Sequence, residues 1–300
     1  MNTRHSSTAL SALLCPRSIA VVGASDRSRW SEAITANLAN GGFPGAVHLV
    51  NRRGGMAHGR QTATDCRAIG EAIDVGIVMV PAQGMLDAVE DLGAAGARAA
   101  VLLTSGFAET GSAGAALQEQ VAERARAHKL RLMGPNSLGF INFTERVHAW
   151  TTPVRSPSRA AGVAIVSQSG ATAYFLAELA WQQDLGLSIV AATGNEADLD
   201  AAGFLDHLVD DPHTRAIALF IETVRHPVRF LAAARRAFAA AKPVVVLKVG
   251  ASEATSKAAA AHTGALVGDD AVFDGVCRQA GVIRVRSIEE LLATADIAGR

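Results

Sequence analysis

With 300 residues, of which 49% are hydrophobic, the chain is long enough for two domains that each bury a sizeable core. Its 28 basic and 28 acidic residues balance, and no basic cluster occurs, which argues against nucleic acid as a partner. Three widely separated cysteines form no CxxC pair, so we expect no metal centre and no disulfide framework, as suits a reducing cytoplasm. Ala9 to Leu14 is too short for a secretion signal, and no stretch approaches the length of a membrane span.

The first half of the chain alternates short apolar runs with longer amphipathic segments. The apolar runs predict strands at Ser18–Gly23, Ala46–Val50, Asp74–Val80, Arg98–Thr104 and Leu130–Met133. The segments between them predict helices at Ser31–Asn40, Gln83–Ala95 and Ala113–His128. Strands that are buried on both faces and alternate with helices are typical of a parallel sheet. We therefore predict a βαβ domain over residues 1–152.

A polar stretch with two prolines, Thr151 to Arg159, predicts the domain boundary. After it the alternation begins again, over residues 160–300. Strands are predicted at Gly162–Ser167, Leu187–Thr193, Arg215–Glu222, Pro243–Val249 and Val282–Val285. Helices are predicted at Gly170–Asp184, Leu199–Val209, Val228–Ala241, Asp269–Ala280 and Ser287–Ile297. The second half is therefore also expected to be a doubly wound parallel α/β unit.

Ligands of open α/β sheets bind where the strands end, so the residues just after each strand are the first candidates. In the first half the candidate binding residues come from five such strand ends. They are Gly23, Ser25, Arg27, Asn51, Arg52, Arg53, Pro81, Gly106, Phe107 and Asn136.

The triplet Asn51-Arg52-Arg53 stands where dinucleotide-binding domains have an acidic residue that holds a ribose hydroxyl. Positive charge there suits a phosphorylated nucleotide rather than NAD. Gly23-Ala24-Ser25 does not form the GxGxxG fingerprint, which counts against NADP without removing it. A solvated basic loop that binds no ligand is the remaining alternative.

In the second half, three features could carry chemistry. Small and hydroxyl residues lead from a strand into a helix start, which predicts an anion site at Ser169, Gly170, Ala171 and Thr172. A simple helix cap is the alternative. Glu222 ends an apolar strand, where it could cap, pair or orient a catalytic histidine. His262 lies between alanines and a Thr-Gly turn, and it is either a nucleophile or an ordinary loop histidine.

Taken together, motifs along nearly the whole chain resemble the NDP-forming (ADP-forming) acyl-CoA synthetases and, more distantly, the α subunit of succinyl-CoA synthetase. The matching stretches are Pro16–Ser25, Ser105–Glu109, Gly134–Asn142, Val166–Gly170, Gly194–Asp198, Lys242–Lys248, His262–Leu266 and Gln279–Val285. The resemblance implies a Rossmann-like CoA-binding domain followed by a flavodoxin-like ligase domain. It also implies that His262 is the phosphohistidine, that Glu222 lies beside it, and that residues 169–172 hold the phosphate.

By the same resemblance, CoA is bordered by Ser25, Arg27, Asn51, Arg52 or Arg53, Pro81 and Asn136. Two departures from the family pattern concern this region. Asn51-Arg52-Arg53 replaces Asn-Pro-Lys, which keeps the positive charge and loses the proline, and Ser137 replaces a usual cysteine. ATP or ADP and Mg²⁺ are expected on an ATP-grasp domain or subunit, because no stretch of this chain resembles one. A small carboxylic acid is the expected substrate, and an oligomer is the expected assembly.

Two other functions stay open on these residues. One is a non-catalytic CoA sensor, like the synthetase-like modules of protein acyltransferases that have lost the histidine. The presence of both His262 and Glu222 argues against it. The other is an NADP-dependent dehydrogenase, which the missing GxGxxG disfavours.

Overall fold

The computed structural model describes residues 10–157, 159–249 and 270–300. The chain divides into two compact units. Unit 1 comprises residues 1–154 together with the short segment 195–199, and unit 2 comprises residues 155–194 and 200–300. None of the helices in the described ranges is both long and apolar enough to cross a bilayer.

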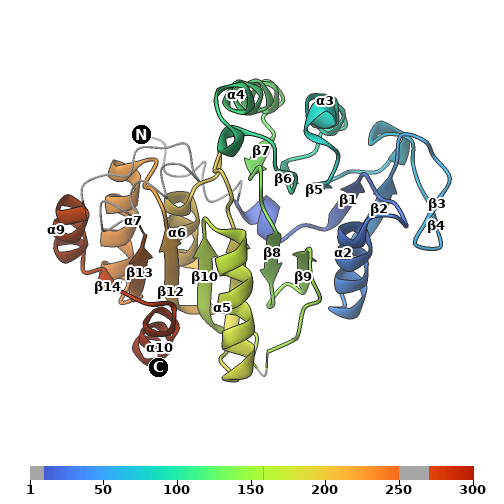
Figure 1. Ribbon diagram of the computed structural model, residues 1–300. Helices are drawn as coiled ribbons and strands as arrows, with labels where there is room; N and C mark the ends of the chain where they lie inside the picture. Colours follow the sequence, from blue (N-terminus) through green and yellow to red (C-terminus); the bar gives the residue numbers. More distant parts are fainter. Residues whose placement is uncertain (1–9, 158, 250–269) are drawn as a thin grey trace. The chain divides into compact units, whose positions relative to one another are not determined.

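Unit 1 is built on a parallel sheet with the strand order β2-β1-β5-β6-β7. The strands are β1 (Ser18–Val22), β2 (Ala46–Val50), β5 (Val75–Val78), β6 (Ala99–Leu102) and β7 (Arg131–Met133). Helices α3 (Met85–Ala94) and α4 (Ser112–Ala127) cover one face, and α2 (Arg29–Asn40) covers the other (Figure 1). All residues of β1, β5 and β6 are buried, as the continuous apolar runs predict for a sheet covered on both faces.

The connections of unit 1 contain short elements that the sequence did not predict. A small antiparallel hairpin pairs β3 (Met56–Ala57) with β4 (Arg60–Gln61), and a second pairs β8 (Gly139–Asn142) with β9 (Val147–Trp150). Single 3₁₀ turns occur at η1 (Arg67–Ile69), η2 (Ala82–Gly84) and η3 (Ala108–Thr110). Strands β8 and β9 are wholly buried, so they lack the polar–apolar alternation that usually reveals a hairpin.

Segment 195–199 lies along β7 within unit 1. The N–H groups of Asn195, Ala197 and Leu199 donate to the carbonyls of Pro135, Gly134 and Leu132, each at 2.9 Å. An unpaired edge strand exposes a row of free backbone groups, which this segment covers. It follows that residues between β11 and α6 in the sequence complete the sheet of unit 1.

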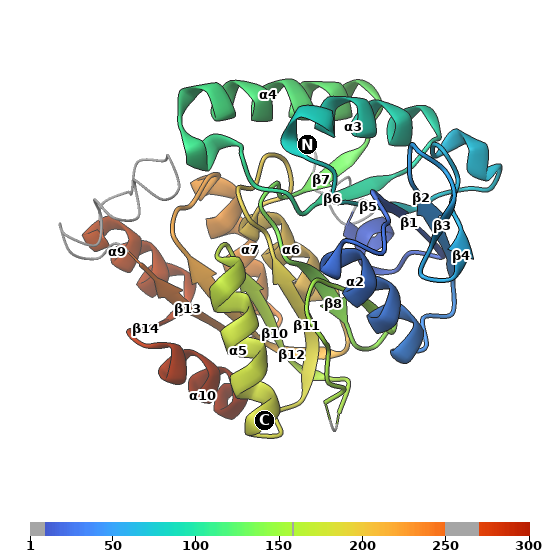
Figure 2. The same cartoon turned by 45° about the vertical axis from the view of Figure 1, so that its right-hand side comes forward.

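Unit 2 contains five adjacent parallel strands in the order β14-β13-β12-β10-β11. They are β10 (Gly162–Ser167), β11 (Leu187–Ala192), β12 (Thr214–Ile221), β13 (Val244–Lys248) and β14 (Ile283–Val285). The helices are α5 (Gly170–Gln182), α6 (Ala201–Asp210), α7 (Pro227–Ala239), α9 (Asp270–Ala280) and α10 (Ile288–Ala298). Helix α6 packs against α7 and α7 against α9, whereas α5 packs against α10, so two helical layers cover the strands (Figures 1 and 2).

The predicted fold class is therefore confirmed in both halves: a Rossmann-like parallel α/β unit is followed by a flavodoxin-like one. Each predicted strand is present, generally shorter by one to three residues at its ends. The reason for the agreement is that the inner strands are buried on two faces, which leaves a strong apolar signal, whereas the edge strands β2 and β14 are only partly buried.

Candidate functional site

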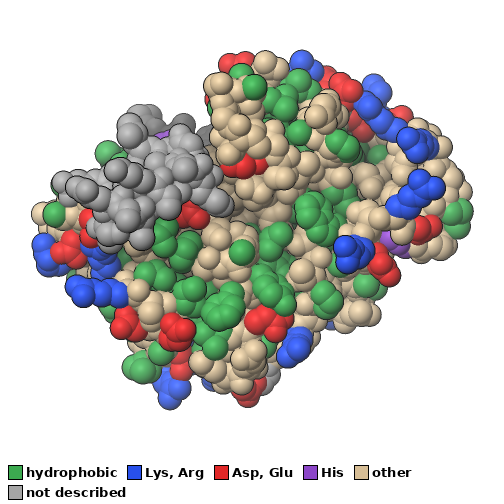
Figure 3. All heavy atoms as spheres, viewed as in Figure 1, with side chains coloured by type: hydrophobic (Ala, Val, Ile, Leu, Met, Phe, Trp, Pro, Cys, Tyr) green, Lys and Arg blue, Asp and Glu red, His purple; other side chains and the backbone are tan. Residues whose placement is uncertain are grey.

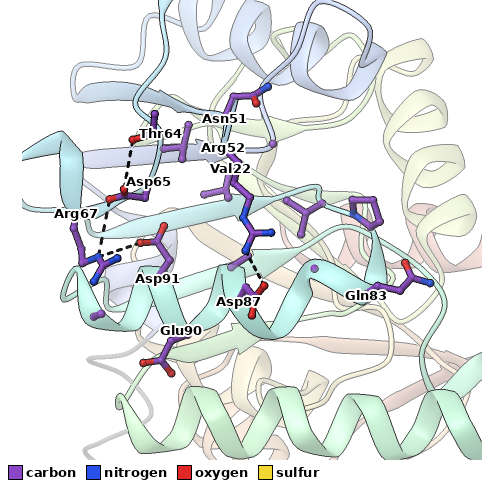
Figure 4. A pocket seen from close by; sticks show the side chains of 17 residues that line it. Val22, Asn51, Arg52, Thr64, Asp65, Arg67, Gln83, Asp87, Glu90 and Asp91 are labelled. Atoms are coloured by element: carbon purple, nitrogen blue, oxygen red, sulfur yellow. Dashed lines mark hydrogen bonds and ion pairs between the residues drawn. The ribbon is translucent and has the colours of Figure 1, made fainter. Parts of the chain in front are cut away.

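A pocket of about 900 Å³ lies in unit 1 beyond the carboxyl ends of β1, β2 and β5 (Figure 4). Four of the predicted binding residues line it. They are Gly23, Asn51, Arg52 and Pro81. They come from three different strand ends that the parallel sheet brings to one edge. Basic side chains gather on this side of unit 1, over β2 and the β3–β4 hairpin (Figure 3).

Gly23 makes the tight turn that opens the pocket. Its φ angle is +93°, which residues with side chains rarely adopt. A Cβ atom at this position would lie 3.3 Å from side-chain carbons of Met79 and Val80. The Gly23 N–H donates to the carbonyl of Val50 at 2.9 Å, which ties the turn to the end of β2. Because Gly23 has no side chain, the backbone can pack against Met79 and Val80, and a ligand in the pocket can approach it closely.

Asn51 holds two of the pocket loops together. Its side-chain amide donates to the carbonyl of Ala24 at 2.7 Å, and its side-chain oxygen accepts from the N–H of Arg53 at 2.9 Å. Both ends of the side chain are therefore engaged within the protein. The arrangement fixes the direction in which the chain leaves β2 and places Arg52 in the lining of the pocket.

Arg52 forms an ion pair inside the pocket. Its guanidinium donates to a carboxylate oxygen of Asp87 at 2.7 Å (Figure 4). Both side chains are mostly exposed, at 73% and 64%, so the pair is weak and an anionic ligand can compete with it. Arg67 also lines the pocket, and its Nε lies 3.6 Å from a carboxylate oxygen of Asp91.

The acidic wall of the pocket was missed in the sequence. Helix α3 contributes its residues from a single face. They are Gly84 at its start, Asp87, Ala88, Glu90, Asp91 and Ala94. The spacing of three and four residues is the available signal, because such residues share one helix face. What the sequence could not indicate is that this face borders the ends of β1 and β2.

Ser25 and Arg27 lie in the loop that leads into α2 and do not line the pocket. The hydroxyl of Ser25 accepts a hydrogen bond from the N–H of Arg27 at 3.2 Å. Ser28 caps the helix by accepting from the N–H of Ser31, also at 3.2 Å. In turn, the Ser31 hydroxyl lies 2.6 Å from Nε2 of His58. The start of α2 is therefore held by hydroxyl groups of the chain itself.

Gly106, Phe107 and Asn136 are brought together by Glu109. The Glu109 carboxylate accepts from the N–H groups of Gly106 at 2.6 Å and Phe107 at 3.1 Å. It also accepts from the side-chain amide of Asn195, whose oxygen lies 3.4 Å from the amide nitrogen of Asn136. Burial raises the pKa of Glu109, but these hydrogen bonds outweigh it and lower the pKa below its ordinary value.

Phe107 points away from the pocket into the core of unit 1. Its side chain is fully buried among residues of α3, α4 and the sheet. Of the Ser105–Glu109 motif, it is therefore the backbone and Glu109 that organise the loop, a role of Glu109 that the sequence did not predict. Its bonds to Gly106 and Phe107 are local, but its contact with Asn195 joins residues 86 apart in the sequence, which no local pattern identifies.

In unit 2, Ser169 is the N-cap of α5. Its hydroxyl accepts from the N–H of Thr172 at 3.3 Å and from the Thr172 hydroxyl at 3.1 Å. The helix interior begins with Gly170 and Ala171, two small residues that leave the first turn accessible. The four residues predicted to hold phosphate are thus together at one helix start.

Glu222 lies at the same edge of the sheet as Ser169. It follows β12, which pairs with β10 so that Phe220 is opposite Ser167. Gln168 bridges the two strand ends, because its side-chain oxygen accepts from the Glu222 N–H at 2.7 Å and its amide donates to the Thr223 carbonyl at 2.7 Å. Glu222 is only 8% exposed, so its carboxylate is held in a restricted environment.

His262 lies outside the described residues. It belongs to the stretch 250–269, which joins β13 to α9 in the sequence. Lys248 at the end of β13 is opposite Ile221 at the end of β12, one residue before Glu222. The end of β13, the last described strand before His262 in the sequence, therefore lies at the edge of the sheet where Glu222 and Ser169 lie. Among the described residues, no group of three or more metal-binding side chains is found.

Two protein families match the two halves of the chain. Residues 17–142 match the CoA binding domain family, and residues 160–298 match the succinyl-CoA ligase like flavodoxin domain family. The chain is 36% identical to trans-feruloyl-CoA synthase FCS1 of an unknown prokaryotic organism, over 99% of this chain and 43% of the relative. It is 35% identical to the α subunit of the ADP-forming acetate–CoA ligase I of Pyrococcus furiosus, over 94% of this chain and 61% of the relative.

A solved structure is similar over the same extent. It is the dinucleotide forming acetyl-coenzyme A synthetase 1 of Ca. Korarchaeum cryptofilum, in complex with phosphate and ADP. The TM-score is 0.87 at 33% identity, over 94% of this chain and 60% of that chain. The chain thus spans between 43% and 61% of the lengths of these relatives.

The comparisons favour the synthetase interpretation over the sensor and dehydrogenase alternatives. The chain belongs to the ADP-forming acyl-CoA synthetase family and carries its CoA-binding and succinyl-CoA-ligase-like domains.

Proposed function

We propose that this chain is the CoA-binding and phosphohistidine part of an acyl-CoA synthetase that interconverts carboxylate, CoA and ATP with acyl-CoA, ADP and phosphate. The observation that carries the proposal is the convergence of Ser169, Glu222 and the carboxyl end of β13, which precedes the His262 segment in the sequence, at one edge of a parallel sheet. We assign residues 1–152 to the CoA-binding domain and 160–300 to the ligase domain, from which segment 195–199 joins the sheet of unit 1.

Coenzyme A is assigned to the pocket of unit 1. Its phosphates are to be met by the Arg52 guanidinium and by Arg27 and Arg53 on the adjacent loops. The turn at Gly23 allows the ligand to approach the backbone closely, and Pro81 forms an apolar part of the wall. Carboxylates of the α3 wall suit the amino and hydroxyl donors of a nucleoside rather than its phosphates. Gly106, Phe107 and Asn136 contribute through the loop that Glu109 holds.

The phosphoryl chemistry is assigned to unit 2. Phosphate attacks the thioester of acyl-CoA, which gives an acyl phosphate and releases CoA as its thiol. A neutral imidazole nitrogen of His262 then attacks the phosphorus, and the carboxylate departs with the bonding electrons. Glu222 orients the ring by accepting its other N–H, and the start of α5 at residues 169–172 stabilises the phosphate charge. Transfer from phosphohistidine to ADP completes the reaction and restores the neutral ring.

A second component is required for that last transfer. We assign ATP or ADP and Mg²⁺ to an ATP-grasp subunit or domain, since the relatives extend well beyond the region that this chain matches. The chain and this component together form the working oligomer. The relatives are named for acetate and for trans-ferulate, so the substrate is assigned only as a small carboxylic acid.

Reconstitution tests the proposal. The purified 300-residue chain should bind CoA in calorimetry and should form no acyl-CoA from ATP, CoA and a carboxylate. Addition of an ATP-grasp component should start turnover and label the chain with one acid-labile phosphate. Steady turnover by the isolated chain, or reconstituted turnover without any labelling of the chain, would contradict the proposal.

A further inference from the structure

A second pocket lies entirely within unit 2, between helices α7 and α9, which pack against each other (Figures 1 and 2). Its volume is about 330 Å³, at the lower end of the range of small-molecule sites. The walls are mainly apolar and include Val224, Phe230, Leu231, Phe273 and Val276. Lys248 is the one charged side chain among the described residues that line the pocket.

Lys248 is an unusually buried ammonium group. Its side chain is 2% exposed, and the carboxylate of Asp270 lies 4.0 Å from Nζ. The carbonyl of Val249 is 3.5 Å away, and the centre of the Phe273 ring is 5.6 Å away. Buried charged groups normally have close hydrogen-bonded partners, and an ammonium has three hydrogens to donate. The Val249 contact is at the outer limit of a hydrogen bond and the Asp270 contact lies beyond it, so Lys248 can still donate to a ligand.

The surrounding charges leave Lys248 without a full counterion. Arg284 donates to the Asp270 carboxylate and lies 3.6 Å from that of Asp274. Arg278 forms its own close ion pair with Asp274. Three cations therefore share two carboxylates, and Lys248 has the longest of the contacts. Burial lowers the pKa of Lys248, and Asp270 opposes that effect only in part.

We propose that this pocket binds an apolar monocarboxylate, with the carboxylate on Nζ of Lys248 and its hydrocarbon or aromatic group between α7 and α9. A carboxylate would supply the counterion that Lys248 lacks, and it needs few hydrogen-bond donors from the protein. Lys248 and Thr223 are the polar residues among those that line the pocket, and so few donors suit the two oxygens of a carboxylate and not a phosphate group. The apolar walls favour a hydrocarbon body over a hydrated one.

The proposal does not rest on CoA binding or on His262. The acid has two conceivable sources, the acyl substrate of the synthetase and a separate effector acid. Both require the same recognition chemistry. Thr223 follows Glu222 directly, so the pocket begins one residue from the proposed phosphoryl site.

Calorimetry on the 300-residue chain tests the proposal with acetate, butyrate, hexanoate, phenylacetate and 1-hexanol. Hexanoate should bind at least about tenfold more tightly than acetate, because each added methylene buries apolar surface. It should also bind about tenfold more tightly than 1-hexanol, which has a similar chain without the charge. Equal affinities of hexanoate and 1-hexanol, or no binding of any acid at millimolar concentration, would overturn the proposal.

Three variants locate the binding. Lys248→Met should reduce hexanoate affinity about tenfold and leave 1-hexanol unchanged, and Val276→Phe should weaken both by filling the pocket. Arg235→Met, which removes an exposed charge from α7 outside the pocket, is the matched control and should bind hexanoate normally. Unchanged hexanoate binding in both Lys248→Met and Val276→Phe would refute the assignment.

The same preparations separate this proposal from the proposed function. Urea unfolding of each variant checks that unit 2 is folded, and CoA binding to unit 1 is measured beside it as an independent activity. In the reconstituted synthetase, a substrate acid is converted to its thioester with a KM that Lys248→Met raises. An effector acid instead changes the turnover of acetate without being consumed. Either result supports the site, and the absence of any acid binding to the unmodified chain, while CoA still binds, removes it.

Discussion

Arg52 and Asp87 form a 2.7 Å ion pair in the pocket of unit 1 that lies beyond the ends of β1, β2 and β5. They come from the end of β2 and from helix α3, and each is more than half exposed. A ligand phosphate that binds Arg52 has to replace the Asp87 carboxylate. The ligand phosphate and the Asp87 carboxylate therefore compete for Arg52, and the affinity for the ligand should change when either charge is removed.

Replacement of Arg52 and Arg53 by alanine should weaken CoA binding by more than tenfold, since charged hydrogen bonds are worth roughly 1.5–3 kcal/mol each. Asp87→Asn should strengthen binding a few fold, because the competing carboxylate is gone. Both effects should shrink as salt is raised from low to physiological concentration. Calorimetry measures them, with Arg126→Ala, in an exposed ion pair with Glu119 on α4, as the matched control. Unchanged affinity in the double variant would place the CoA phosphates elsewhere.

His262→Ala should abolish the acid-labile phosphate and lower turnover of the reconstituted synthetase by at least on the order of 10³-fold, because the covalent nucleophile is lost. Glu222→Gln should slow phosphorylation while CoA affinity stays the same, since Glu222 is assigned to the ring and not to CoA. Rapid-quench phosphorylation with labelled ATP gives both rates. Near-normal turnover of His262→Ala would exclude the phosphohistidine route.

Asp198→Ala should loosen segment 195–199 from β7. Its carboxylate accepts from Arg131 at 2.7 and 2.9 Å and from the Leu132 N–H at 2.9 Å, and both side chains are about three-quarters buried. The loss leaves Arg131 unpaired and should cost about 1–3 kcal/mol. Hydrogen exchange at the amides of Leu132 and Leu199 should accelerate accordingly.

Asp210→Ala provides the comparison for that variant. Asp210 pairs with Arg236 in unit 2 at 2.9 Å but is 65% exposed, and Arg236 keeps Asp206 as a partner. Exposed pairs contribute at most about 1 kcal/mol. Equal effects of Asp198→Ala and Asp210→Ala on urea unfolding would show that segment 195–199 does not depend on the Arg131 pair.

His148 should make the chain less stable in acid. Burial lowers its pKa from 6.5 to about 4, and its ring packs edge-on against Phe143 with centroids 5.4 Å apart. The unfolded chain takes up the proton near pH 6.5 and the folded chain only near pH 4. The stabilising contribution of the neutral ring is therefore complete above pH 6.5 and is lost as the pH falls towards 4, at up to about 1.4 kcal/mol per pH unit.

Urea unfolding at several pH values between 4 and 8 measures this slope. His148→Gln should flatten it, because the buried titrating group is removed. His213→Gln, at an exposed position after α6, is the control and should keep the wild-type slope. A slope that survives in His148→Gln would assign the acid sensitivity to other groups.

The sequence by itself determined the two parallel α/β units, the order of their strands and helices along the chain, and the strand ends where ligand-binding residues gather. These features are local, because an apolar run buried on both faces and a glycine or proline that ends it are visible within ten or so residues. The helix start at Ser169 was predictable for the same reason, since a cap needs only its own next three residues.

The tertiary structure alone decided which distant residues meet. Nothing near Asn195 indicates that it binds Glu109, or that residues 195–199 complete the sheet of unit 1. The acidic face of α3 opposite Arg52 and the apolar pocket around Lys248 likewise depend on helices packing beside strands from elsewhere in the chain. The spacing of apolar and charged residues along a helix or strand indicates only that one of its faces is apolar or charged. Which surface that face meets is fixed when the whole chain packs, because the contact energy is shared between residues that local patterns never place together.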